Sequence, residues 1–90
     1  MVEIWITHAG DARYRVEVRD GESSTTHEVT ASGAHVARYG GGAAAERLIE
    51  ESFRFLLERE PKESILGTFE LPVIEKYFPD YPKKIRSRLR

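Results

Sequence analysis

The stretch RYRVEVR, Arg13–Arg19, alternates between apolar and charged side chains. Tyr14, Val16 and Val18 fall on one face and the charged side chains on the other, which is typical of an antiparallel strand with one buried face. The turn-forming sequences AGDA and DGES flank this stretch, so the chain is expected to reverse at both ends. The pattern therefore predicts the central strand of a three-stranded meander.

The neighbouring segments supply the two outer strands. Val2–His8 places valine and isoleucine on one face and carries Trp5 on the other, charged face. The weaker segment Thr25–Ala31 turns His27 and Val29 inward. Trp5 is thus the one large apolar side chain on the charged face of the predicted sheet.

Side-chain parity also predicts the register, because matching faces must meet. Pairing Ile6 with Val16 brings opposite charges together across the first two strands. Pairing Arg15 with Glu28 does the same for the second and third strands, whereas a slip of two residues would set two glutamates against each other.

After the sheet the periodicity becomes helical. In AAAERLIEESFRFLLERE, Ala43–Glu60, six charged residues fall within an arc of about 140° at ~100° per residue: Glu46, Arg47, Glu50, Glu51, Arg54 and Glu58. The remaining face is broad and apolar, which suits a helix lying across a sheet better than a coiled-coil seam. The sequence therefore predicts one long helix over the apolar face of the meander.

Shorter helices are predicted on both sides of it. Ser32 can cap a helix over Gly33–Tyr39, which three consecutive glycines end. Pro61 stops the long helix, and KESIL can form one further turn. Pro72–Phe78 begins with the proline that favours a first helical position, and Asp80 can cap a final helix.

Length and composition limit the architecture. Ninety residues with 40% hydrophobic content support a single domain, residues 1–90, with little room for a deep pocket. The expected fold is α+β: a three-stranded antiparallel meander packed on one long helix, with short N-terminal and C-terminal accessory helices. Residues 1–31 form the sheet in this interpretation, and residues 32–90 form the helical half.

The chain contains no cysteine, and it has no apolar run of the ~18 residues that a membrane span requires. Disulfides and thiolate chemistry are therefore excluded. We expect a cytoplasmic protein without a membrane segment.

The C-terminal half carries a resemblance. Its motifs are SFRFLLEREPKESIL and FELPVIEKYFPDYP, and they resemble the pattern SFxFLLEREPxxSIL followed by FxLxVIxxYFPxY in a family of short bacterial proteins. Glu70 and Pro72 stand where that pattern has Asp and Ser, so Pro72 takes over part of the helix-starting role. The resemblance implies no activity and transfers no functional residue.

The first candidate site is on the charged face of the sheet. Trp5 lies there with Arg15 and Arg19 beside it, and Trp and Arg are typical anchors of protein interfaces. These three residues predict a surface for a protein partner or for self-association as a dimer. The alternative is that another segment covers Trp5, or that it only stacks on an arginine.

The second candidate is the basic tail. Its residues are Lys83, Lys84, Arg86, Arg88 and Arg90, whereas the preceding residues carry 9 basic and 15 acidic side chains, a net charge of −6. Such a helix can bind a nucleic-acid backbone. It can equally offset its own dipole and lie near the acidic face of the long helix.

No pattern predicts catalysis, a metal or a cofactor. His8, His27 and His35 lack ligand spacing, and no serine has a nucleophile-elbow context. The glycines before Ala43 lack the lysine of a phosphate-binding loop and are expected to end a helix. The leading hypothesis is a small non-catalytic interaction or regulatory module, with a nucleic-acid-binding accessory protein as the alternative.

Overall fold

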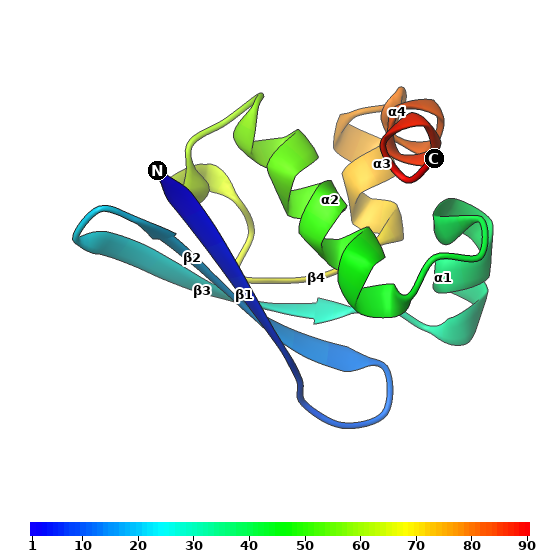
Figure 1. Cartoon of the computed structure of the whole chain (residues 1–90), viewed down its shortest axis with the longest axis horizontal. Helices are drawn as coiled ribbons and strands as arrows, with labels where there is room; N and C mark the ends of the chain where they lie inside the picture. Colours follow the sequence, from blue (N-terminus) through cyan, green and yellow to red (C-terminus); the bar gives the residue numbers. More distant parts are fainter.

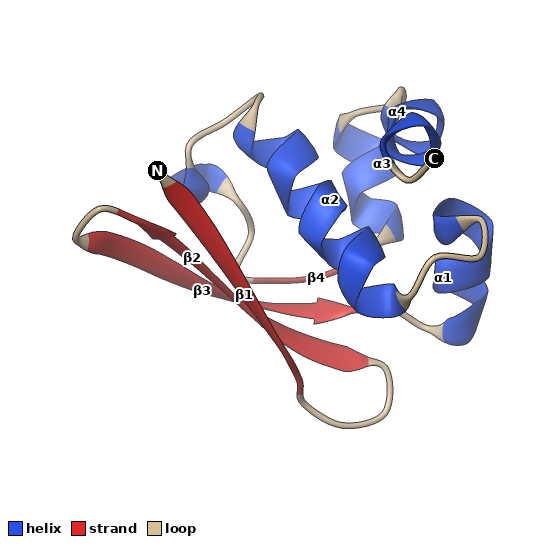
Figure 2. Cartoon of the chain, viewed as in Figure 1, coloured by secondary structure: helices blue, strands red, loops and turns tan.

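The computed structural model describes every residue from Met1 to Arg90 and arranges them in two layers (Figure 1). The strands are β1 (Val2–His8), β2 (Arg13–Asp20), β3 (Ser23–Thr30) and β4 (Thr68–Glu70). The helices are α1 (Gly33–Gly40), α2 (Ala45–Leu57), α3 (Pro72–Tyr77) and α4 (Tyr81–Arg88), with a 3₁₀ turn at Lys62–Ser64. All helices lie on one side of the sheet in Figure 2, so the α+β class is confirmed.

Strands β1, β2 and β3 pair antiparallel and in the predicted register. Ile6 lies opposite Val16, and Arg15 lies opposite Glu28. The apolar residues of β2 are consequently buried, and its arginines remain exposed on the other face. Side-chain parity was sufficient to predict this arrangement because each of these strands has one buried face.

The fourth strand corrects the expected fold. The sheet is four-stranded and mixed, with order β1-β2-β3-β4, and β4 runs parallel to β3 with Phe69 beside Val29. The expected three-stranded antiparallel meander is therefore wrong in strand count, whereas the long helix is accompanied by short helices on both sides as expected. A three-residue strand with one buried side chain is too short to show the alternation that predicts strands.

The sheet and the helices share one hydrophobic cluster of 17 buried residues. Val16 and Val18 enter it from β2, and Leu48 and Phe53 enter it from α2, each fully buried. Burying a side chain of this size contributes about 1.5–3 kcal/mol. Contact between the two layers is therefore one of the main sources of the fold's stability.

The ends of the helices follow local side-chain chemistry. Ser32 caps α1 as predicted: the His35 N–H donates to its hydroxyl at 3.2 Å, and its own N–H donates to His35 Nδ1 at 3.3 Å. Gly41 ends α1 in the left-handed conformation at φ 57°. Asp80 occupies the predicted N-cap position of α4, but its carboxylate makes no cap hydrogen bond and instead accepts one from Arg59 at 2.9 Å.

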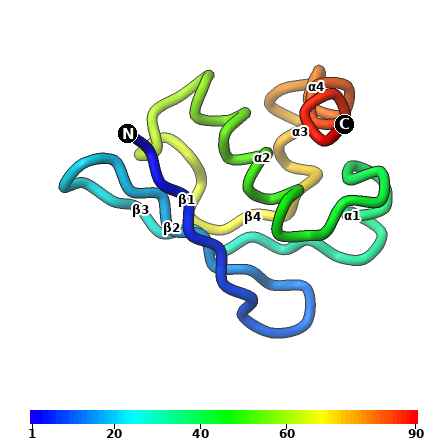
Figure 3. The backbone as a smooth tube through the Cα atoms, viewed as in Figure 1, coloured from blue at the N-terminus to red at the C-terminus, as the bar shows by residue number.

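Helix α4 docks on the helical layer. Figure 3 follows the chain from its first strands to this helix at the edge of that layer. Tyr81 and Ile85 are fully buried and Leu89 is half-buried, which confirms the apolar seam expected of this segment. None of the helices has the length and apolar character needed to cross a membrane.

Candidate functional site

Strand β1 forms one edge of the sheet, and the hydrogen bonds at the ends of the neighbouring strands show which of its peptide groups face outward. The Ala9 N–H donates to the Arg13 carbonyl at 2.9 Å, and the Ala31 N–H donates to the Ala12 carbonyl at 2.8 Å. In an antiparallel strand both peptide groups of one residue point to the same side, and the sides alternate. Odd-numbered residues of β1 therefore face β2, and even-numbered residues face away from the sheet.

The outward-facing peptide groups belong to Val2, Ile4, Ile6 and His8. Natural edge strands are commonly protected by proline, lysine, bulges or very short length. Strand β1 has seven residues, an unbroken register, no proline or lysine, and Glu3 as its one acidic side chain. The opposite edge, β4, is only three residues long. The outer edge of β1 is thus the longest stretch of sheet edge that has no strand partner.

Trp5 lies at the centre of β1 and points to the open face of the sheet. Its side chain is 55% exposed, and it stands opposite Glu17. Arg15 and Arg19 are the diagonal neighbours on the same face, and Arg19 donates to Glu17 at 3.1 Å. The structure therefore brings together the three residues predicted for partner binding, and no segment covers Trp5.

A groove separates the β1 edge from the start of α2. Ile4 and Ile6 form its floor and are half-buried, which leaves part of each side chain at the edge. The groove has a volume of about 550 Å³, and its lining residues are Ile4, Ile6, Ala44, Glu46, Arg47, Glu50 and Glu51. Apolar surface therefore adjoins the outward-facing peptide groups.

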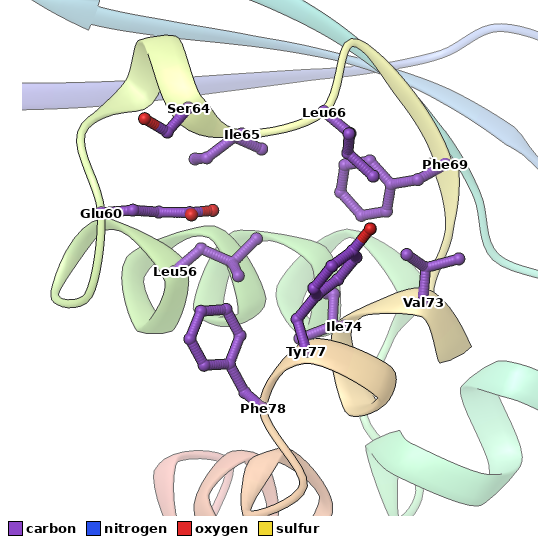
Figure 4. Close-up of a pocket in the computed structure, with 10 residues that line it drawn as sticks. All are labelled: Leu56, Glu60, Ser64, Ile65, Leu66, Phe69, Val73, Ile74, Tyr77 and Phe78. Carbon is purple, nitrogen blue, oxygen red and sulfur yellow. The ribbon is translucent and has the colours of Figure 1, made fainter.

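A second, apolar pocket lies near the opposite edge of the sheet (Figure 4). Its volume is about 440 Å³, and it is lined by Leu56, Glu60, Ser64, Ile65, Leu66, Phe69, Val73, Ile74, Tyr77 and Phe78. Sequence reasoning missed this pocket because its walls come from four separate segments. The available signal was weak: Leu66 and Tyr77 are large apolar residues, and they are 46% and 66% exposed.

Buried His27 holds one wall of this apolar pocket. Its ring is 2% exposed; Nδ1 donates to the Leu66 carbonyl at 2.8 Å, and Nε2 accepts from the Thr25 hydroxyl at 2.8 Å. The Glu28 N–H donates to the Gly67 carbonyl at 2.7 Å. The backbone of the loop that carries Leu66 is thus tied to β3.

The basic tail divides into paired and free residues. Arg88 pairs with Glu58 and lies 3.8 Å from Glu51, both on the acidic side of the long helical segment. Arg86 donates to the Arg38 carbonyl at 2.9 Å. The side chains without a partner in the structure are Lys83, Lys84 and Arg90. The tail therefore presents three free cations rather than five.

The histidines lie apart from one another. His8 contacts the Asp11 carbonyl at 2.6 Å, His35 takes part in the α1 cap, and His27 binds Leu66 and Thr25. The structure contains no group of three His, Asp or Glu side chains placed to hold a metal ion. Each histidine has a local hydrogen-bonding role instead.

No protein-family model, curated protein or solved structure matches the chain. The family resemblance of the C-terminal half consequently stays a prediction. The function has to be inferred from the chemistry of the chain's own surfaces.

Proposed function

We propose that this chain is a small non-catalytic, cytoplasmic interaction module that pairs with a second copy of itself along the outer edge of β1. The observation that carries the proposal is the row of outward-facing peptide groups on a strand that lacks edge protection. Main-chain hydrogen bonds supply affinity in such strand addition, and alternate side chains supply specificity. Trp5 is the anchor on the open face.

The alternation of peptide groups selects a register. In an antiparallel pair centred on Trp5, the two tryptophans meet, Ile4 meets Ile6 of the second copy, and Glu3 meets Thr7. The even-numbered residues then form the hydrogen-bonded pairs, as their outward peptide groups require. Trp5 forms a pair without hydrogen bonds, in which Cα atoms approach to about 4.5 Å and side chains lie closest.

This register agrees with the charges and the apolar groups. No like charges meet within it, because Glu3 faces a threonine. Contact between two aromatic rings contributes about 0.5–1.5 kcal/mol beyond the area they bury. A pair centred on Ile4 would instead set Trp5 against Glu3 and leave the ring without an aromatic partner. The Trp5-centred pair is therefore the favoured one.

Substitutions at Thr7 test the register by sedimentation equilibrium. Thr7→Glu sets two glutamate pairs against each other across the interface and should raise the dimer Kd about tenfold. Thr7→Lys sets two lysine–glutamate pairs there and should leave the Kd unchanged or lower it. The double variant Glu3→Gln/Thr7→Glu removes the two glutamate pairs without setting a lysine opposite Arg19 and should recover dimerisation.

Thr26→Glu is the matched control, because Thr26 is an exposed threonine on the same face in β3. It should leave the Kd unchanged. Trp5→Ala should raise the Kd by about tenfold or more, as is typical of a central tryptophan, while the far-ultraviolet circular dichroism stays the same. Equal effects of Thr7→Glu and Thr7→Lys would reject this register, and a monomeric wild-type chain at millimolar concentration would reject self-pairing.

A further inference from the structure

We infer that the apolar pocket of Figure 4 is a binding site for a small organic cation, an ammonium group attached to a compact apolar or aromatic body. The pocket lies beside β4, at the opposite edge of the sheet from β1. It is therefore separate from the surface proposed for self-pairing. Its size, its charge and its aromatic side chains each point to this class of ligand.

The shape suits a small molecule. A volume of about 440 Å³ falls within the range of roughly 300–1,000 Å³ that is usual for ligand pockets. Leu56, Ile65, Phe69 and Ile74 are buried and form an apolar floor. An apolar group entering the pocket would replace water on this floor, and burial contributes about 25 cal/mol for each Å² of apolar surface.

The backbone at the rim is fixed by a contact made outside the pocket. The Leu66 carbonyl accepts a hydrogen bond from buried His27, which holds this part of the loop in place. Tyr77 lies on α3 and is 66% exposed, with its ring at the side of the pocket in Figure 4. The concavity is thus part of the folded chain and requires no rearrangement to admit a ligand.

The charge of the pocket comes from Glu60. Its side chain extends into the pocket in Figure 4, and its carboxylate has no hydrogen-bond or ion-pair partner. The cations nearest in sequence are committed elsewhere: Arg59 binds Asp80 at 2.9 Å, and Lys62 binds Glu63 at 2.7 Å. A cation supplied by a ligand would therefore be the partner of Glu60.

An aromatic side chain adds to the preference for a cation. Phe69, Tyr77 and Phe78 line the pocket; Phe69 is buried and Phe78 already lies 5.8 Å from the Arg59 guanidinium, so the exposed Tyr77 is the ring open to a ligand. A cation within about 6 Å of an aromatic ring is attracted by the negative face of the ring. A carboxylate next to aromatic rings favours an ammonium ligand, and it disfavours an anionic ligand of the same shape.

The test compares three probes that share a phenyl group: phenethylammonium, 2-phenylethanol and 3-phenylpropionate. Their binding to the full chain is measured from amide chemical shifts in ¹H–¹⁵N spectra. Phenethylammonium should move the amides of pocket residues and bind about three- to fivefold more tightly than the alcohol, the size expected of a partly exposed ion pair. The propionate should bind more weakly than the alcohol.

Glu60→Gln should abolish the difference between ammonium and alcohol and leave alcohol binding unchanged. Glu46→Gln is the matched control, because it removes an equal charge from an exposed site on α2 outside this pocket and should keep the difference. The inference is overturned if none of the probes shifts pocket amides, or if Glu60→Gln keeps the preference for ammonium. Neither result bears on pairing at β1, which is measured by sedimentation.

Discussion

A single buried tyrosine joins the last helix to the long one. Tyr81 donates its hydroxyl hydrogen to Ser52 Oγ at 2.7 Å, because Ser52 already donates to the Leu48 carbonyl at 2.7 Å. Both side chains are fully buried. Burial raises the pKa of Tyr81 above its ordinary value.

The raised pKa gives a pH dependence with a definite sign. The folded state keeps Tyr81 neutral, so its contribution to stability is complete below pH about 10, the ordinary tyrosine pKa. It is lost as the pH rises above that value, because the unfolded chain then releases the proton more readily. Tyr39, whose pKa burial and its hydrogen bond to Glu75 also raise, acts in the same direction.

We predict that Tyr81→Phe lowers the free energy of unfolding by about 1 kcal/mol at neutral pH, because one buried hydrogen bond is lost. Above pH about 10 the variant should lose stability less steeply than wild type. Urea unfolding across neutral and alkaline pH measures both effects. Parallel stability curves for the two proteins over the alkaline range would contradict the assignment.

At the scale of secondary structure, alternation and helical periodicity predicted the three long strands and the helices that begin at Gly33, Pro72 and Tyr81. The positions of Trp5, Arg15 and Arg19 on one open face followed from the same parity. Strand β4 was not predictable, because its position depends on a parallel contact with β3 that no local pattern records. The apolar pocket could not be predicted for the same reason, because its lining residues come together only after β4 and α3 have packed.

The packing of helix α4 against the helical layer can be tested by substituting its buried residue. Ile85 is fully buried against the helical layer, whereas Lys84 is exposed on the same helix. Ile85→Ala should lower the free energy of unfolding by about 2–4 kcal/mol, since it removes buried methyl groups and leaves a cavity. Lys84→Ala is the control and should change it by less than about 0.5 kcal/mol. Equal, small losses measured by chemical denaturation would show that α4 does not share the main core.

At the scale of the whole molecule, the distribution of charge disfavours the alternative function, nucleic-acid binding. Residues 1–82 carry a net charge of −6, and the five tail cations bring the net charge of the whole chain to −1. Arg88 is held by carboxylates of the same molecule, and Arg86 binds a backbone carbonyl. The acidic body and the occupied arginines both disfavour a phosphate backbone.

We therefore predict no binding to mixed-sequence duplex DNA or RNA at about 150 mM salt, where surface charges are screened beyond ~8 Å. Fluorescence anisotropy with a labelled duplex measures this over a salt titration. Tight binding that Lys83→Ala/Lys84→Ala removes, with a reduced salt slope, would instead favour the nucleic-acid hypothesis.

The parallel pairing of β4 with β3 also predicts the order in which the strands pair during folding. β1, β2 and β3 are joined by short turns and can pair as soon as those turns form, whereas Val29 and Phe69 are separated by α1 and α2. Closing a long loop costs more chain entropy than closing a hairpin, so distant pairings form later. During refolding the hairpins are expected to form before β4 docks. Until then the outer side of β3 is a second open edge, and a folding chain is briefly more exposed to wrong strand pairing than the finished molecule.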